Sequence, residues 1–256
     1  MGRIETEKIG NLLLRNYSGI LDDELEEMLE LWINKENPCN AATGSGSPQS
    51  VGAITAWLKN YALKGWHGFE EANFADWVLH ANQNGGWSRV TDEVYHQASS
   101  GYMYAGTPGA MAQDYHMRKW NIGTLGKEVR CELWLRLQIE VIGAATRTAR
   151  AFLAIGTSAS PSQILVESVS QAGEGTTTKD WARFLVIFYQ DDAIPYNKWA
   201  KVYRREGDSW VFQRDFDFGG VGDWSFCDHI YLRTDTYDGG KAHSWWDKLL
   251  VFKTKV

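Results

Sequence analysis

The stretch that decides the fold is residues 127–139, Lys-Glu-Val-Arg-Cys-Glu-Leu-Trp-Leu-Arg-Leu-Gln-Ile. From Cys131 onward apolar and polar residues alternate, so that Cys131 and the leucines point to one side and Trp134, Arg136 and Gln138 point to the other. A period of two over this length is typical of a β-strand with one face in a core. The stretch therefore predicts a sheet with a buried apolar face and a polar-aromatic outer face.

Similar β-type runs continue on both sides of this stretch, separated by clusters of Gly, Asn, Asp, Ser and Pro. No helical interval lies between them, which predicts an antiparallel sandwich or barrel after about residue 65. The content of 13 Trp, 11 Tyr and 10 Phe also favours strands. Residues 170–180 predict a mobile loop, and residues 204–208 predict a tight hairpin connection. The expected strands are 87–94, 101–105, 110–117, 127–139, 149–156, 162–169, 181–189, 199–205, 209–216, 227–233 and 245–253.

The N-terminal residues differ in composition from the rest of the chain. Residues 1–40 contain 4 basic and 9 acidic side chains, which accounts for −5 of the formal net charge of −6. Residues 22–33 have apolar side chains at helical spacing after two aspartates, which predicts an amphipathic helix. Its acidic face is either a solvated surface or a docking surface for a basic partner.

A domain boundary is expected near residue 50. Residues 37–52 are rich in Asn, Pro, Ala, Thr, Gly and Ser, as linkers are. Residues 53–63 have the apolar spacing of a second, short helix. The chain therefore divides into an acidic helical arm and linker, residues 1–50, and a β-sandwich with a short leading helix, residues 51–256.

Composition and charge exclude several classes of protein. Residues 41–256 carry 22 basic and 23 acidic side chains, and a body so close to neutral lacks the basic patch that nucleic-acid binding needs. The sequence contains no run of 18 apolar residues, so it predicts no membrane-spanning helix. Cys39, Cys131 and Cys227 lack the spacing of zinc ligands. The first residues hold no apolar signal region, so we expect synthesis in the cytoplasm without a signal peptide.

Two further strands alternate in the same way as residues 131–138. Residues 199–205 and 227–233 each place aromatic and polar side chains opposite apolar ones. On neighbouring strands of one sheet, these rows would form a surface of aromatic platforms and planar hydrogen-bond donors, which suits a sugar. The alternative is an ordinary polar sheet face with scattered aromatic residues. The candidate ligand-binding residues are Trp134, Arg136, Gln138, Trp199, Tyr203, His229, Tyr231 and Arg233.

Four segments carry a resemblance to a known family. They are residues 68–77 (Gly-Phe-Glu-Glu-Ala-Asn-Phe-Ala-Asp-Trp), 85–87 (Gly-Gly-Trp), 96–104 (His-Gln-Ala-Ser-Ser-Gly-Tyr-Met-Tyr) and 244–252 (Ser-Trp-Trp-Asp-Lys-Leu-Leu-Val-Phe). Over about residues 65–256 the chain resembles the concanavalin A-like and carbohydrate-binding jelly-roll domains. The resemblance implies a two-sheet antiparallel jelly-roll sandwich, in which the first and last strands pair, preceded here by the short N-terminal helical segment.

The resemblance also implies a ligand surface and a metal. Such domains commonly bind glycans on a concave face, and some hold a structural Ca²⁺ near the paired termini. Carried over by position, the calcium ligands are Glu70 and Asp247. Two carboxylates are only part of the six to eight oxygens that Ca²⁺ takes. The alternative is a solvated glutamate and an aspartate that is hydrogen-bonded to a turn.

Some relatives of this fold are glycoside hydrolases or polysaccharide lyases. A retaining hydrolase needs two carboxylates about 5 Å apart, and Glu128 and Glu132 have a suitable spacing along one strand face. The family's Glu-x-Asp-x-x-Glu strand is absent, and no serine-hydrolase, zinc-protease or phosphate-loop motif occurs. His229, near Tyr231 and Arg233, is either a lyase-type acid/base group or a surface histidine. The question of catalysis stays open, and the residues favour a non-catalytic role.

Three functional hypotheses follow. The first is a non-catalytic virion structural or accessory protein, of the capsid or tail of a phage-like virus, because virion proteins need no signal peptide. Residues 1–50 would dock to other virion subunits, and the sandwich would bind glycans or partner subunits. The alternative is a glycoside hydrolase or polysaccharide lyase that uses the concave face. The third is an assembly protein, a homo-oligomer for example, whose aromatic face is a protein interface.

Overall fold

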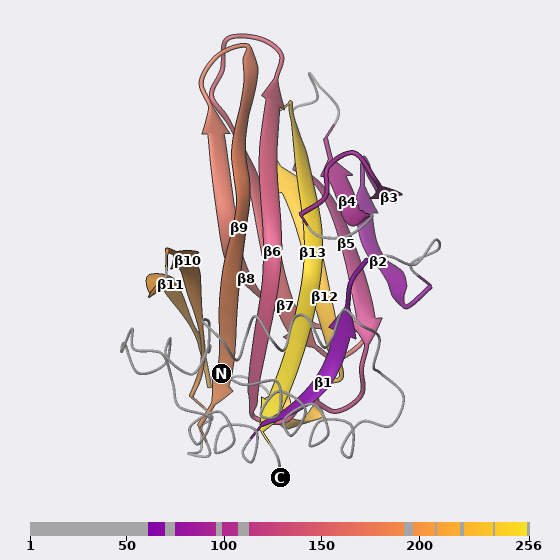
Figure 1. The fold of residues 1–256 in the computed structure, drawn as a ribbon, viewed down its shortest axis with the longest axis vertical. Coiled ribbons are helices and arrows are strands. Elements are labelled where there is room, and N and C mark those ends of the chain that lie inside the picture. The colour runs from indigo at the N-terminus through magenta and orange to yellow at the C-terminus, as the bar shows by residue number, and fades with distance from the viewer. Residues whose placement is uncertain are drawn as a thin grey trace, which may run out of the picture.

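The computed structural model describes residues 61–69, 75–95, 99–106, 113–191, 197–207, 209–220, 223–237 and 239–254. Within these ranges two antiparallel sheets pack face to face (Figure 1), which confirms the predicted mostly β, two-sheet jelly-roll sandwich. In the same ranges the one helical element is the three-residue 3-10 turn Trp224–Phe226. A helix able to span a membrane is therefore not found in the described part of the chain.

The larger sheet has eight strands. Their order is β11-β10-β9-β6-β13-β4-β3, and β1 pairs with the C-terminal end of β13. The three longest strands, β6, β9 and β13, lie side by side in its centre (Figure 1). The strands are β1 Tyr61–His67, β3 Gly85–Val90, β4 Ser100–Ala105, β6 Glu128–Val141, β9 Gly175–Gln190, β10 Lys198–Glu206, β11 Ser209–Gly219 and β13 Gly240–Thr254.

The smaller sheet has five strands in the order β2-β5-β12-β7-β8. All of their pairings are antiparallel. The strands are β2 Trp77–Gln83, β5 Asp114–Asn121, β7 Arg147–Gly156, β8 Pro161–Gln171 and β12 His229–Thr236.

The period-two alternation of the strands builds the core between the sheets. On β6 residues 129–133 are all buried, and from Leu133 to Val141 burial alternates, with the apolar residues, such as Leu133 and Leu137, buried against the smaller sheet. β12 contributes Ile230 to the same core. Because alternate side chains point to opposite faces, the polar and aromatic residues of β6 lie on the outer face of the larger sheet.

Each of the eleven expected strands corresponds to one of the strands β3–β13. The predicted mobile loop at residues 170–180 is wrong except at residues 172–174, which connect β8 to β9. β8 continues to Gln171 and β9 begins at Gly175, where its threonines pair with the end of β6. Pairing with β6 holds this polar segment in a strand despite its loop-like composition. The predicted hairpin joins β10 to β11 through Gly207, whose φ of 56° suits a tight turn.

The N-terminal expectations have mixed outcomes. The helix at residues 22–33 and the boundary near residue 50 lie outside the described residues. The short helix predicted at 53–63 is wrong for residues 61–63, which belong to β1. The last strand, β13, pairs with β1 along residues 249–254. The first and last strands therefore do pair, but the first strand precedes the segment 68–77 that carries the family resemblance.

Candidate functional site

Three adjacent strands of the larger sheet, β6, β13 and β4, carry aromatic and polar side chains on their outer face. The strands are neighbours in the order β6-β13-β4, although β4 and β13 are far apart in sequence. We call this patch the β6–β13–β4 face. Its residues are Trp134, Arg136 and Gln138 from β6, His243 and Trp245 from β13, and Tyr102 and Tyr104 from β4.

Arg136, Trp245 and Tyr102 form one row across the three strands. The Arg136 guanidinium carbon lies 5.0 Å from the centroid of the Trp245 ring, as in a cation–π contact. The Tyr102 ring lies 5.4 Å from the same ring. Trp245 is only 7% exposed. It therefore supports its two neighbours, which are themselves half-buried and reach solvent.

Gln138, His243 and Tyr104 form the next row. The Gln138 side-chain oxygen accepts a hydrogen bond of 3.1 Å from the Thr178 hydroxyl on β9, which orients the amide group. The Lys241 amine lies 5.5 Å from the Tyr104 ring centroid. Gln138 and Tyr104 are half-buried, so this row presents an amide and an aromatic ring to a ligand.

A hydrogen bond joins the two rows. The Tyr102 hydroxyl lies 2.6 Å from His243 Nδ1, and His243 Nε2 lies 3.6 Å from a carboxylate oxygen of Glu140. Burial lowers the pKa of His243, Lys241 lowers it further, and Glu140 opposes both. Burial, assisted by Tyr104, Glu140 and Asp92, raises the pKa of Tyr102 to about 12. The lowered pKa favours a neutral His243, which accepts a hydrogen bond from the Tyr102 hydroxyl at Nδ1 and directs its Nε2–H toward Glu140.

Trp134 lies in the row next to Arg136 and is covered by an aromatic ring from a loop. The Tyr95 ring stacks on it with centroids 3.6 Å apart and planes 19° apart, and Trp181 lies 5.9 Å from Tyr95. The Arg183 guanidinium lies 5.8 Å from the Trp134 ring and forms a buried ion pair with Glu132. Burial, with a smaller contribution from Arg205, lowers the pKa of Arg183 to about 9.

A second residue of that loop reaches the same surface. Glu93 forms an ion pair with Arg136. Its main-chain oxygen accepts a hydrogen bond of 2.6 Å from the Ser100 hydroxyl at the start of β4. The segment between β3 and β4 therefore contacts the face at two points, Trp134 through Tyr95 and Arg136 through Glu93.

The predicted residues Trp199 and Tyr203 lie on the same outer face but in a different place. Both are on β10, and the whole of β9 separates them from β6. Trp199 stacks on Tyr189 with centroids 4.9 Å apart, and Tyr203 packs against the buried Leu185. They form an apolar cluster two strands away from Trp134.

The prediction that His229, Tyr231 and Arg233 share a sheet with Trp134 is wrong. All three are on β12 in the smaller sheet, so they point to the opposite side of the sandwich. Tyr231 is fully buried, and its hydroxyl donates to the Thr157 carbonyl. His229 pairs with its neighbour in sequence, Asp228. Their alternation resembles that of β6, but sheet membership is decided by pairing between distant strands.

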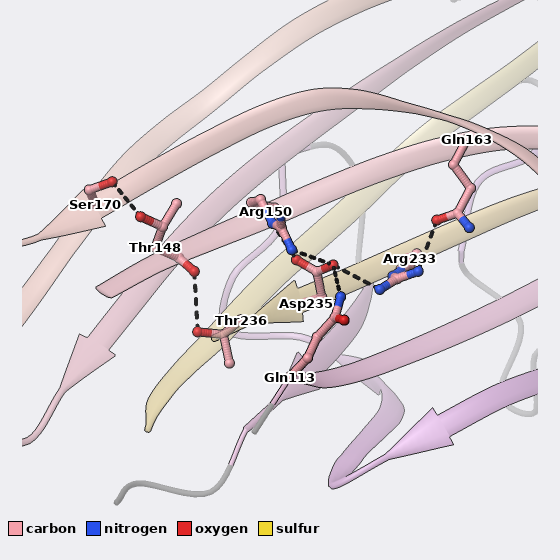
Figure 2. Close-up of polar contacts among 8 residues, drawn as sticks. All are labelled: Gln113, Thr148, Arg150, Gln163, Ser170, Arg233, Asp235 and Thr236. Carbon is pink, nitrogen blue, oxygen red and sulfur yellow. Dashed lines mark hydrogen bonds and ion pairs between the residues drawn. The ribbon is translucent and has the colours of Figure 1, made fainter. Parts of the chain in front are cut away.

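Arg233 belongs to a polar network on the smaller sheet (Figure 2). The fully buried Asp235 accepts hydrogen bonds from Arg150 Nε at 2.7 Å and from Arg233 at 2.9 Å. Gln163 in turn accepts one from Arg233 at 3.1 Å, and Gln113 donates one to Asp235 at 3.3 Å. The carboxylate thus joins side chains of β7 and β12, and the network fastens these strands together.

The carboxylates proposed for a hydrolase are engaged in ion pairs. Glu132 pairs with Arg183, and Glu128 lies 2.8 Å from Arg130. A retaining hydrolase needs one carboxylate that is free to attack the sugar. The geometry on β6 therefore does not favour that chemistry.

The structure leaves the calcium prediction untested. Glu70 lies outside the described residues. Asp247 is 1% exposed, and its carboxylate accepts a hydrogen bond of 2.8 Å from the Lys248 backbone N–H. The part of the chain that the structure describes contains no group of three or more His, Cys, Asp or Glu side chains placed to hold a metal.

The sequence interpretation missed four residues of the site, Tyr102, Tyr104, His243 and Trp245. The period-two pattern that could have identified them is in the sequence. Tyr102 and Tyr104 alternate with the buried Met103, and His243 and Trp245 alternate with the buried Ser244. Tyr95 lies in a loop, which has no periodic pattern from which its contact with Trp134 could be predicted.

Comparisons with known proteins give structural neighbours only. No protein-family model matches the chain, and a search of curated proteins gives no match. The structure is similar to an endo-β-1,4-glucuronan lyase from the fungus Trichoderma reesei, with 15% identity, a TM-score of 0.48, and coverage of 75% of this chain and 96% of that chain.

Two other neighbours have comparable coverage. A cellulose-induced protein, Cip1, has 13% identity and a TM-score of 0.46, with 73% of this chain and 96% of that chain covered. The CBM22-1 xylan-binding domain of Paenibacillus barcinonensis Xyn10C has 10% identity and a TM-score of 0.39, with 77% and 96% covered. All three TM-scores are below 0.5, so these similarities support no inference about function.

Proposed function

We propose that the protein binds glycan chains on the β6–β13–β4 face. One observation carries the proposal: Trp134, Tyr104 and the Trp245-supported Arg136 lie on three adjacent strands and point to the same side. Aromatic rings give the C–H-rich face of a sugar a platform, and planar arginine and glutamine side chains bind pairs of oxygens. The combination suits a ligand that has both an apolar face and many hydroxyl groups.

The size of the face favours a chain over a single sugar. Three strands span about 10 Å, because neighbouring strands lie about 4.8 Å apart. From Trp134 to Gln138 the face extends about 14 Å along β6, at about 3.4 Å per residue. A surface of this size accommodates several sugar units of an oligosaccharide.

The test is binding by a variant that lacks the platform. A glycan array identifies ligands for the wild type, and isothermal titration then measures affinity for the best of them. Trp134→Ala is expected to raise Kd by about tenfold or more, as loss of a central aromatic contact does. Tyr115→Ala serves as the control, because Tyr115 is a half-buried aromatic residue of β5 in the other sheet.

Two results would reject the proposal. One is a wild-type protein that binds no glycan on the array. The other is an unchanged Kd for Trp134→Ala while circular dichroism shows an intact fold.

The role of the whole protein stays a prediction. We propose, as the sequence suggests, a virion protein in which residues 1–50 dock to other subunits and the sandwich displays the glycan surface. The virion role is tested by looking for the protein in purified virus particles. If the protein is absent from them, the virion role is rejected.

A second candidate function is a polysaccharide lyase, which the contact between Tyr102 and His243 favours. In β-elimination from a uronate, a base removes the proton at C5, the bond between C4 and its oxygen breaks, a C4–C5 double bond forms, and an acid protonates the leaving oxygen. Burial lowers the pKa of His243, which favours the neutral form that a base needs. Its Nδ1 can take the C5 proton only when the Tyr102 hydroxyl, which contacts it in this structure, turns from it to the leaving oxygen. Tyr102, with a pKa of about 12, keeps the proton that an acid donates, and Arg136 offers positive charge to the uronate carboxylate.

Catalysis is tested through the double bond that this reaction forms. Polymers of glucuronate, galacturonate and mannuronate are incubated with the protein, and ultraviolet absorbance of unsaturated products is followed. If the protein is a lyase, we expect unsaturated product with the wild type and a large loss of rate in Tyr102→Phe and His243→Ala. No absorbance change with any of the polymers would leave the protein a binder.

A further inference from the structure

The segment that joins β3 to β4 places two side chains on the proposed glycan surface. The Tyr95 ring lies flat over Trp134, with centroids 3.6 Å apart, and the Glu93 carboxylate pairs with Arg136. Trp134 and Arg136 are two residues apart on β6, which places them about 7 Å apart on one side of the strand. A ring of the protein itself therefore covers the Trp134 platform, and a carboxylate of the protein itself pairs with the Arg136 guanidinium.

This pair of contacts matches the chemistry of one kind of sugar. A hexuronate residue has a six-membered ring with C–H groups on its face and a carboxylate attached to that ring. Its ring would stack where Tyr95 stacks, and its carboxylate would bind Arg136 where Glu93 binds. A neutral hexose would replace only Tyr95, because it has no carboxylate to exchange for that of Glu93.

We propose that Glu93 and Tyr95 act as an internal substitute for a hexuronate residue, and that the surface takes uronate-containing glycans, which displace both side chains. This proposal rests on the proposed function, because it names the ligand class of the same surface. It makes Arg136 the residue that selects for uronate over neutral glycans. Glu93 and Tyr95 become residues that weaken binding by competition.

The surroundings allow this exchange. Glu93 is 41% exposed in its side chain and Tyr95 is 43% exposed, so both can turn into solvent. The Ser100 hydroxyl holds the backbone oxygen of Glu93, so the side chain can leave while the backbone keeps its anchor. Arg136 retains its contact with the Trp245 ring after Glu93 departs. The uronate carboxylate then replaces that of Glu93, and no uncompensated charge remains on the face.

The exchange also explains why charge is needed on the ligand. Arginine binds a carboxylate by paired, charge-assisted hydrogen bonds, which are stronger than bonds to a neutral hydroxyl. Specificity arises when the wrong ligand leaves a group of the site unsatisfied or has to compete for it. A neutral glycan has to leave the Glu93–Arg136 pair in place beside it, or break the pair without replacing it.

The experiment measures Kd by isothermal titration with four probes. They are hexamers of β-1,4-glucuronate and of galacturonate, and the carboxyl-reduced form of each. The proteins are the full-length wild type and the variants Glu93→Gln, Tyr95→Ala and Asp92→Asn. Asp92 is an exposed residue of the same segment, so Asp92→Asn removes an equal charge near the face without breaking the pair with Arg136.

The proposal predicts a specific pattern. The wild type binds at least one uronate hexamer more tightly than its reduced form. If the two side chains occupy the surface nine times in ten, their removal lowers Kd for the uronate about tenfold. Glu93→Gln and Tyr95→Ala are each expected to lower it several-fold, and Asp92→Asn is expected to change it by much less.

The remaining outcomes overturn it in distinguishable ways. Equal affinity for uronate and reduced hexamers rejects the ligand class. Wild-type binding that Glu93→Gln and Tyr95→Ala leave unchanged or weaken rejects the competition, while the proposed glycan binding stands. If Asp92→Asn raises the affinity for the uronate as much as Glu93→Gln does, the increase is due to the overall charge near the face. That result also rejects the competition. A wild type and variants that bind no glycan at all, on the array or by titration, reject the proposed function and this proposal together.

Discussion

Side chains of similar type have different roles in this protein because their surroundings differ. Trp134 and Tyr231 both alternate with apolar neighbours on a strand, yet Trp134 lies on an outer surface and Tyr231 is fully buried. Tyr231 packs with Met117 and Ala154 and satisfies its hydroxyl through the Thr157 carbonyl. An amphipathic ring can be buried whenever its polar end finds a partner, so alternation alone cannot separate a platform from a packing residue.

His67 shows the cost of burying a group that can be charged. Its ring lies 4.5 Å from Phe69, 5.8 Å from Trp77 and 5.6 Å from Trp120. Its Nδ1 accepts a hydrogen bond of 3.0 Å from the Phe69 backbone N–H. Burial lowers its pKa from 6.5 to about 4, because the apolar rings disfavour the charged form.

We therefore predict that the protein loses stability as the pH falls from about 6.5 to about 4. In this window the unfolded chain binds a proton at His67 and the folded chain does not, so protonation favours unfolding. The loss from His67 is about 3 kcal/mol, and above pH 6.5 its contribution is constant. His67→Asn keeps an acceptor for the Phe69 N–H and does not titrate. Chemical denaturation at pH 7, 5 and 4 should show a smaller pH dependence in this variant, and an equal dependence would contradict the prediction.

Strands in this protein form where a neighbour can pair with them, even against local composition. β1 has the sequence Tyr-Ala-Leu-Lys-Gly-Trp-His and a bulge between Leu63 and Gly65. The bulge interrupts the period-two alternation of β1, so the strand cannot be recognised from its sequence pattern. The glycine at the bulge allows close packing, because a Cβ added to Gly65 would lie 2.8 Å from the Trp120 ring. The threonine-rich start of β9 likewise forms a strand because β6 extends far enough to pair with it.

Gly86 on β3 has a comparable role for the proposed glycan surface. A Cβ at this position would lie 2.5 Å from Cε1 of the Tyr104 ring, closer than such atoms approach. Gly86→Ala is therefore expected to displace Tyr104 and to weaken glycan binding several-fold, with a modest fall in Tm. Ser88→Ala, an exposed position on the same strand, is the control. Unchanged affinity in Gly86→Ala would show that Tyr104 does not contact the ligand.

The sandwich as a whole has two outer faces with different chemistry. The larger sheet presents the β6–β13–β4 face, with two loop side chains over it. The smaller sheet presents a network in which Asp235 joins Arg150 and Arg233 (Figure 2). In the larger sheet β13 pairs with three strands, β6, β4 and β1. This central position lets one strand contribute both to the proposed site and to the contact between the two ends of the described chain.

The predicted calcium site concerns this meeting of the chain ends. If Glu70 and Asp247 hold Ca²⁺, Tm should be higher in millimolar calcium than in EDTA. A ligand at 100 times its Kd stabilises the folded state by about 2.7 kcal/mol. The increase should disappear in Asp247→Asn, whose Tm is measured in both buffers. Equal Tm values of the wild type in calcium and in EDTA would remove the site.

The amino-acid sequence determined the eleven strands β3–β13, the two-sheet class and the outward direction of Trp134, Arg136 and Gln138. These properties depend on residues close together in the chain, where a period of two reports burial directly. Only the tertiary structure decided which strands are neighbours. It brought Tyr102 and His243 within 2.6 Å across 141 residues and placed His229, Tyr231 and Arg233 on the opposite sheet. A hairpin pairing such as β10 with β11 can be predicted from its turn, whereas pairing between strands that are distant in the sequence depends on the packing of the whole core.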